Sequence, residues 1–511
     1  KHTLGVTLLQ SIQEDKRESV NVAMENLPAD NLKYYDLGSG LVTNTIGSSM
    51  VKWNMASFMG RINYNYLGRY LLTVSARYDG SSRLADGHKW VLFPSAALAW
   101  RINEESFMSS TSGWLDNLKL RLGFGKTGNS AVDPYQTKGT LSLIRYPFDN
   151  GGTPTIGYAP NAMANSLLTW ETTDQWNLGI DFGVLRGRIN GTIDLYMQNT
   201  HDLLLKRQLP VVSGFPDVLS NVGKTRNKGI EVSINSMNIN SKDFQWTTDL
   251  MLSSNKEEIV ELYNGKNDDI GSKWFIGQPV NVHYDYRKVG IWQNTESDLA
   301  EMAKFAANGT EFAPGDIKIQ DVNGDYKITD ADKQILGNPR PKLIASMVNT
   351  FNYKGFDLSV FLYASFGAML YNDIYAVEHC GRNGGVKVDY WTPNNPTNAY
   401  PRPSIDEERP IYITSTYYEK ADFLRVKTMT LGYTLPKTLT NKFLVEKLRV
   451  YFTAQNPFIF TNYTGIDPEA AKVNSAGNPE TNGSGFGTPS VSSWIFGINL
   501  TCLLYTSPSP R

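Results

Sequence analysis

The sequence predicts an all-β fold, and more narrowly a transmembrane antiparallel up-and-down β-barrel. Three observations lead to this prediction: apolar and polar residues alternate along many segments, these segments are long, and their connections are short at one end and long at the other. Many segments extend for about 10–12 residues, the length of a tilted strand that crosses a bilayer, whereas globular strands usually span about 5–6. About fifteen strands are expected on this basis.

The alternation is clearest between Arg188 and Gln198, where Arg, Asn, Thr and Asp residues are interleaved with Ile, Gly, Leu and Met. Successive side chains of a strand face opposite sides, so each such segment has one apolar and one polar face. The same pattern is found in residues 56–66, 70–79, 118–126, 230–235, 244–255, 357–366 and 447–455. Because a soluble sandwich would share it, alternation alone does not identify a membrane protein.

The connections are sorted by length. Short turns contain the pairs Leu67-Gly68, Arg186-Gly187 and Lys354-Gly355. Long polar stretches occupy residues 127–170, 257–340, 368–421 and 457–490. Short turns on one side and long loops on the other are typical of outer-membrane barrels, in which the long loops face outward.

Aromatic residues gather near the predicted strand ends. They are Tyr64, Tyr66, Tyr70, Tyr78, Trp90, Trp100 and Trp246. Such positions are typical of the girdles in which amphipathic rings lie at the level of the lipid headgroups. Packing of these rings in a soluble β core is the alternative interpretation.

Composition argues against several classes of function. Lys+Arg is 49 and Asp+Glu is 50, so the net charge is 49 − 50 = −1 and gives no electrostatic reason to expect nucleic acid as a partner. The two cysteines, Cys380 and Cys502, are too few for a disulfide scaffold, and the five histidines form no zinc-binding pair. We expect no enzyme and no required cofactor. The chain starts at Lys1 without an apolar signal segment, so we expect a fragment.

A series of short strings follows along nearly the whole chain. They include residues 77–83 (RYDGSSR), 114–121 (WLDNLKLR), 125–129 (GKTGN), 227–231 (NKGIE), 315–318 (GDIK), 337–341 (GNPRP), 353–358 (YKGFDL) and 431–436 (LGYTLP). In these strings, and in their order and spacing, the sequence resembles the SusC-like (SusC/RagA) family of TonB-dependent outer-membrane transporters. One such string would be weak, whereas this many in series is specific.

The resemblance implies a plugged barrel of about 22 strands in the outer membrane. Residues 1–501 would be the C-terminal part of this barrel, with the plug, the TonB-contacting segment and the first strands outside the chain. It also implies TonB-dependent active import of a nutrient, with a SusD-like surface lipoprotein as partner and outer-membrane lipid around the wall. A glycan fragment is preferred to an oligopeptide as substrate. The alternatives are a passive porin-type channel and, less favoured, a soluble multi-domain glycan-binding protein.

Residues 321–332 (DVNGDYKITDAD) form the sharpest local motif. Oxygen-bearing side chains at loop positions 1, 3, 5, 9 and 12, with the carbonyl of residue 7, match the spacing of an EF-hand-type or dockerin-type Ca²⁺ loop. The candidate ligands are Asp321, Asn323, Asp325, Lys327 (through its carbonyl), Thr329 and Asp332. The motif has Tyr326 where Gly is usual and Asp where Glu is usual. An Asx-rich turn without metal is the alternative. A bound Ca²⁺ would stiffen the loop rather than take part in catalysis.

The C-terminal region predicts a last strand and then a break. Trp494, Phe496, Ile498 and Leu500 alternate with polar or small residues, which predicts a strand with a lipid-facing row. In the SusC-like family such a strand typically ends on an aromatic residue at the position of Cys502. Because a tail with two prolines follows here instead, we expect residues 502–511 to be non-native.

The sequence leaves the substrate contacts open. Aromatic residues of the long loops have two roles to consider, stacking on sugar rings or packing between loops. They are Trp274, Trp292, Tyr390 and Trp391.

Overall fold

The computed structural model describes residues 1–148, 154–372, 387–404, 409–440, 442, 445–469 and 489–502. Fourteen strands form one sheet, in which each strand lies beside the next one along the chain. They are β1 (His2–Glu25), β2 (Val42–Tyr66), β3 (Tyr70–Ser81), β4 (Trp90–Arg101), β5 (Leu115–Asn129), β8 (Glu171–Val184), β9 (Ile189–His201), β12 (Lys224–Asn240), β13 (Phe244–Glu261), β18 (Leu343–Tyr353), β19 (Phe356–Phe366), β22 (Phe423–Thr434), β23 (Val445–Thr461) and β24 (Ser493–Cys502).

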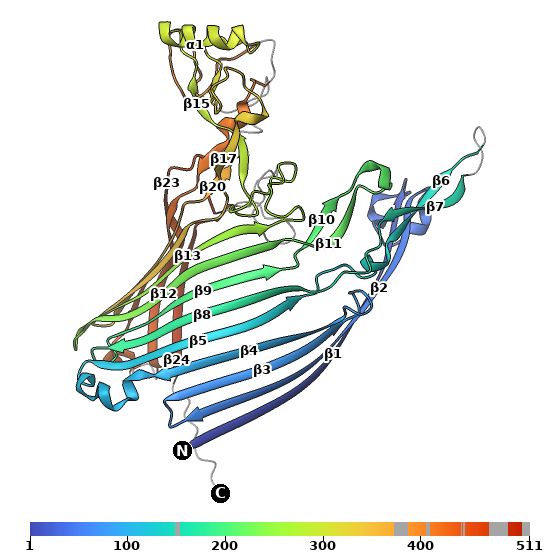
Figure 1. The fold of residues 1–511 in the computed structure, drawn as a ribbon. Coiled ribbons are helices and arrows are strands. Elements are labelled where there is room, and N and C mark those ends of the chain that lie inside the picture. Colours follow the sequence, from blue (N-terminus) through green and yellow to red (C-terminus); the bar gives the residue numbers. More distant parts are fainter. Residues whose placement is uncertain are drawn as a thin grey trace.

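The sheet is antiparallel throughout and curves as an open wall, with β1 and β24 as its edges within the described residues (Figure 1). The all-β prediction is confirmed. The wall has fourteen strands, close to the expected number of about fifteen. The alternating segments singled out in the sequence lie in these strands, except that Arg188 precedes the first residue of β9. Within the described residues, no helix is both long enough and apolar enough to cross a membrane.

One end of the wall carries short turns. The β2–β3 turn places Leu67 and Gly68 at φ values of 57° and 74°, and Gly187 and Gly355 also have positive φ in their turns. Tight hairpin turns whose central residues have positive φ match the right-handed twist of the flanking strands, which explains why glycine recurs here. The predicted short connections are therefore confirmed.

The long loops that the structure describes lie at the other end of the wall. Small two-stranded sheets form within these loops: β6 (Thr140–Tyr146) with β7 (Thr155–Ala162), β10 (Leu204–Gln208) with β11 (Asp217–Asn221), β14 (His283–Tyr286) with β17 (Lys333–Gly337), β15 (Lys288–Ile291) with β16 (Ile317–Ile319), and β20 (Met369–Tyr371) with β21 (Tyr418–Lys420). Helix α1 (Glu296–Ala307) lies at the far end of the longest loop (Figure 1).

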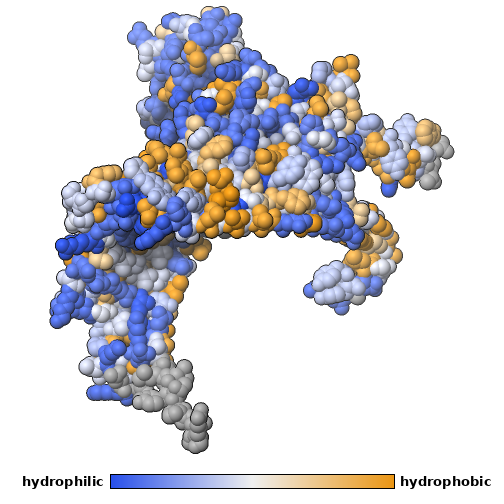
Figure 2. Space-filling model, turned by 60° about the horizontal axis from the view of Figure 1, so that its bottom comes forward, coloured by the Kyte–Doolittle hydropathy of each residue, from blue (hydrophilic) through white to orange (hydrophobic). Residues whose placement is uncertain are grey.

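Two of the long loops fold together as a compact unit, which we call the head (described residues of 283–337 and 387–421). Its two apolar clusters contain the largest of the fully buried side chains among the described residues, namely Trp292, Phe305 and Tyr417. The head surface is mostly hydrophilic, whereas the larger apolar patches lie over the sheet below it (Figure 2). The buried core is therefore in the loops, not in the wall.

Cys502 is the last residue of β24 and lies opposite Val445 of β23. The expectation that residues 502–511 are non-native is not tested, and residues 503–511 lie outside the described residues.

Candidate functional site: polar wall, cavity and head

The wall has an outward apolar face and an inward polar face. Leu98, Leu122, Leu178, Leu195 and Ile230 lie side by side on five consecutive strands. Each is 41–49 % exposed, so this apolar row does not pack against other protein. In an outer-membrane barrel the outward apolar rows contact lipid, whereas a soluble sandwich would bury such rows between its two sheets.

Aromatic rings mark both ends of the apolar face. Tyr66, Tyr70 and Trp100 stack in series at the short-turn end, and Tyr78 stacks on Trp90 at the other end. Trp90 and Trp100 begin and nearly end the same strand, ten residues apart. At about 3.3 Å per residue and a tilt of about 40°, ten residues rise about 25 Å, the height of the apolar band in outer-membrane barrels. The predicted girdles are confirmed in position.

The polar face carries a charged bridge across three strands. Arg121 of β5 donates to Asp181 of β8 at 2.9 Å and to Asp194 of β9 at 3.0 Å, and Lys119 reaches Asp181 at 2.7 Å. Gly179 lies beneath the bridge: a Cβ there would come within 2.5 Å of the Arg121 guanidinium carbon. The missing side chain is what lets the arginine cross the middle strand.

The same arrangement recurs elsewhere in the wall. Arg449 of β23 donates to Asp357 of β19 at 2.9 Å across Gly432 of β22. A Cβ on Gly432 would lie 2.5–2.6 Å from both charged groups. Each bridge joins strands that are distant in sequence, so neither could be read from the residue pattern.

A cavity of about 920 Å³ lies where β9, β12 and β13 meet the segments 277–279 and 335–342. Its lining combines the amide side chains of Asn255, Gln278 and Asn338 with Tyr196, the aliphatic residues Ile335 and Leu336, and the lysines Lys228, Lys256 and Lys342. The ion pair of Glu257 with Arg340 (2.6 Å) joins the wall to the loop on one side. A cavity of this size with a few convergent polar groups fits a small organic ligand.

The junction between wall and head contains buried polar groups. Nε2 of His283 lies 2.7 Å from the Met369 carbonyl, and burial lowers the pKa of this histidine. Lys288 donates to the Ala399 carbonyl at 2.7 Å, and burial lowers the pKa of its amine to about 8. These contacts hold the two loops of the head together at its base.

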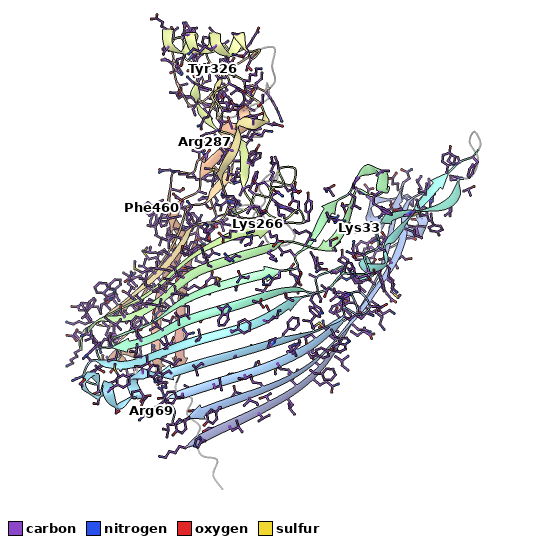
Figure 3. The ribbon with its side chains drawn as sticks, in the orientation of Figure 1. Lys33, Arg69, Lys266, Arg287, Tyr326 and Phe460 are labelled. Carbon is purple, nitrogen blue, oxygen red and sulfur yellow. The ribbon has the colours of Figure 1, made fainter. Side chains whose placement is uncertain are left out.

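The predicted Ca²⁺ loop lies in the head, where Figure 3 places Tyr326 near α1 and far from Arg69 at the short-turn end. The carboxylate of Asp321 accepts from the backbone N–H groups of Gly324 and Tyr326, both at 2.8 Å. Tyr326 adopts φ 59°, so it takes the left-handed conformation that glycine usually supplies at this position.

Other side-chain oxygens of the 321–332 loop also accept backbone hydrogen bonds. Asp325 accepts from Lys327 N–H, and the fully buried Asp332 accepts from the N–H groups of Val322 and Thr329. The described residues contain no group of three or more His, Cys, Asp or Glu placed to hold a metal. A Ca²⁺ ligand set would therefore depend on Asn323, Thr329 and the Lys327 carbonyl as well, and the site stays a prediction.

The loop aromatics divide by burial. Trp292 and Trp391 are 0 % and 6 % exposed in the cores of the head, where Trp391 also donates to Gln293 at 2.8 Å. These two rings pack between loops and are not free to stack on a sugar. Tyr390 is 46 % exposed and Trp274 is half-buried, so both stay accessible.

The sequence matches a family model described as the β-barrel of TonB-dependent receptor-like proteins, over residues 24–456. Among curated proteins, it is 35 % identical to the TonB-dependent receptor SusC of Bacteroides thetaiotaomicron over 434 residues, 81 % of this chain and 41 % of that protein. It is 32 % identical to TonB-dependent receptor P3 of Formosa agariphila, over 98 % of this chain and 50 % of that protein. The chain spans about half the length of the curated relatives it matches.

Solved structures give the same fold. The RagAB peptide transporter superposes with a TM-score of 0.81 at 23 % identity, covering 98 % of this chain and 53 % of that one. At this identity the match establishes the fold.

Proposed function

The chain belongs to the TonB-dependent receptor-like β-barrel family, and on that premise we propose that it forms the wall and outer surface of an active importer of nutrients. The family is one of outer-membrane receptors and transporters rather than of enzymes. The observation that carries the proposal is the wall itself, with an exposed apolar row outside, charged bridges inside and the described long loops at one end. Import through such a wall would be driven by TonB acting on a part of the protein outside this chain.

We propose that the substrate is an oligosaccharide fragment. The support is the 920 Å³ cavity, whose neutral amides Asn255, Gln278 and Asn338 offer both donors and acceptors to hydroxyl groups. An oligopeptide is the second candidate, because the similar RagAB structure is described as a peptide transporter.

We further propose that a SusD-like surface lipoprotein docks on the head. The head has its own buried core and projects beyond the rim of the wall, so it offers a rigid platform above the lumen (Figure 1). A Ca²⁺ ion in the 321–332 loop would stiffen this platform. No residue of the loop would take part in transport chemistry.

The importer is distinguished from a porin by its energy source. Uptake of a fluorescent oligosaccharide by cells that carry the full-length protein should stop when a protonophore collapses the proton gradient. Uptake that continues unchanged would instead support a passive channel. Competition by unlabelled oligosaccharide or by oligopeptide then identifies the substrate class.

The cavity can be tested separately. Replacing Gln278 and Asn338 by Ala together should lower apparent affinity by up to about 30-fold, since two hydrogen bonds of about 1 kcal/mol each are lost at most. Asn267, an exposed loop residue that donates to the Asn264 carbonyl, provides the matched control as Asn267→Ala. Equal effects of both variants would contradict the assignment of the cavity.

A further inference from the structure

Two lysines face each other directly on the outward face of the wall. Lys228 of β12 and Lys256 of β13 are register partners, and both side chains are exposed. Alternation places them on the same face as Leu195 and Ile230 of the apolar row. Like charges directly opposite each other on neighbouring strands are destabilising, because their Cβ atoms are only about 5 Å apart.

Their local neutralisation is incomplete. Glu258 lies 3.4 Å from Lys256, but it is shared with Arg226 at 3.6 Å. Among the described residues, no carboxylate forms an ion pair with Lys228. The four groups therefore leave a net charge of 3 − 1 = +2 on a small area of the outward face.

A second opposed pair in the same sheet shows the contrast. Lys16 of β1 and Lys52 of β2 are also register partners on the outward face. There each lysine has its own carboxylate, Glu18 at 2.6 Å from Lys16 and Glu14 at 2.9 Å from Lys52. Each lysine of the Lys16/Lys52 pair thus has a carboxylate partner of its own, whereas the Lys228/Lys256 pair does not.

The unneutralised pair lies at the boundary of the apolar band. Trp176, Met197, Lys228 and Lys256 form one register row, and the next row toward the short-turn end contains Leu178, Leu195 and Ile230. Lys256 lies ten residues along β13 from Trp246, an aromatic residue of the short-turn end, and ten residues also separate the girdle residues Trp90 and Trp100 of β4, so Lys256 lies at the level of the opposite girdle. Since β12 begins and β13 ends at the long-loop end (Figure 1), the lysines lie on the extracellular side of the band, beside the outer leaflet.

We propose that Lys228 and Lys256 bind the phosphate of a phosphorylated glycolipid of the outer leaflet. The phosphate would sit between the two amines, and an acyl chain would lie along Leu195 and Ile230 below them. The same four residues contribute to the lining of the 920 Å³ cavity, together with Lys342. The site follows from the outer-membrane location and does not depend on which substrate is transported.

The test compares lipid binding by the full-length protein and two double variants. Purified protein in detergent is titrated with lipid A, with enzymatically dephosphorylated lipid A, and with inorganic phosphate alone, and bound lipid is counted by native mass spectrometry. Replacing Lys228 and Lys256 by Gln should weaken lipid A binding by about 30-fold, at about fivefold per cation near a charged lipid surface. Replacing Lys16 and Lys52 by Gln is the matched control and should change binding little.

Several results would overturn the proposal. They are unchanged lipid A binding in the Lys228/Lys256 variant, equal binding of the dephosphorylated lipid, and displacement of the lipid by millimolar inorganic phosphate. Heat-modifiable gel migration verifies that each variant is folded. If the double variant fails this check, Lys228→Gln alone decides the question, with at least a threefold loss expected and no loss contradicting the site.

Discussion

A positive charge at the middle of the outward face should destabilise the protein far more than the same charge one residue away. Val74 of β3 is 44 % exposed on this face, with Ile62 and Ala96 as its register partners. Its neighbour Thr73 faces the lumen, where it donates to Asn63 at 2.9 Å. The informative pair of substitutions is therefore Val74→Arg and Thr73→Arg.

The magnitude follows from the depth of Val74. This residue is four positions from Tyr70 and four from Tyr78, which belong to the two girdles. Four residues at about 3.3 Å each, tilted by about 40°, place it about 10 Å from either girdle and thus near the bilayer midplane. Arginine at the midplane of a barrel costs about 2–4 kcal/mol, which lowers the ratio of folded to unfolded protein by about 30- to 900-fold.

The assay is reversible denaturant unfolding of the full-length protein in phospholipid vesicles, followed by tryptophan fluorescence. Val74→Arg should lower the free energy of unfolding by about 2–4 kcal/mol, and Thr73→Arg by less than about 1 kcal/mol. Equal losses for both variants would refute the assignment of the two faces. The interpretation of every other outward row as lipid-facing would then also be wrong.

Three further predictions concern the bridge, the head and the Ca²⁺ loop. Gly179→Ala should cost about 1–3 kcal/mol in the same unfolding assay because its Cβ collides with the charged bridge, whereas Gly47→Ala, with open space around its Cβ, should cost less. Lys288 has a pKa of about 8 in the folded protein and 10.5 in the unfolded chain, so it binds its proton less tightly when folded. The stability of the head should therefore rise as pH increases from about 8 to 10.5, by at most about 3 kcal/mol. Lys288→Met should abolish this slope in thermal melts. Calorimetric titration should detect Ca²⁺ binding to the unaltered protein, and no heat would contradict the site. Asp325→Ala should remove this binding. Asp330→Asn, at a position without a proposed ligand, should preserve it.

The sequence determined the strands, their faces and the sorting of their connections. These properties depend on local period, because side chains two residues apart always share a face and Gly-containing turns fix the hairpins. The run from Arg188 to Gln198 was therefore enough to predict β9 and its two faces. The family also followed from short strings in order.

Only the tertiary structure decided which residues of the polar face meet. Arg121 and Asp194 are 73 positions apart, and Arg449 and Asp357 are 92 apart, so their bridges depend on strand order and register rather than on pattern. The structure also placed Trp292 and Trp391 in the buried cores of the head, where the sequence left sugar stacking open. The opposition of Lys228 to Lys256 is likewise a matter of register. Local period gives each residue a face, but neighbours across strands are fixed only when the whole sheet pairs.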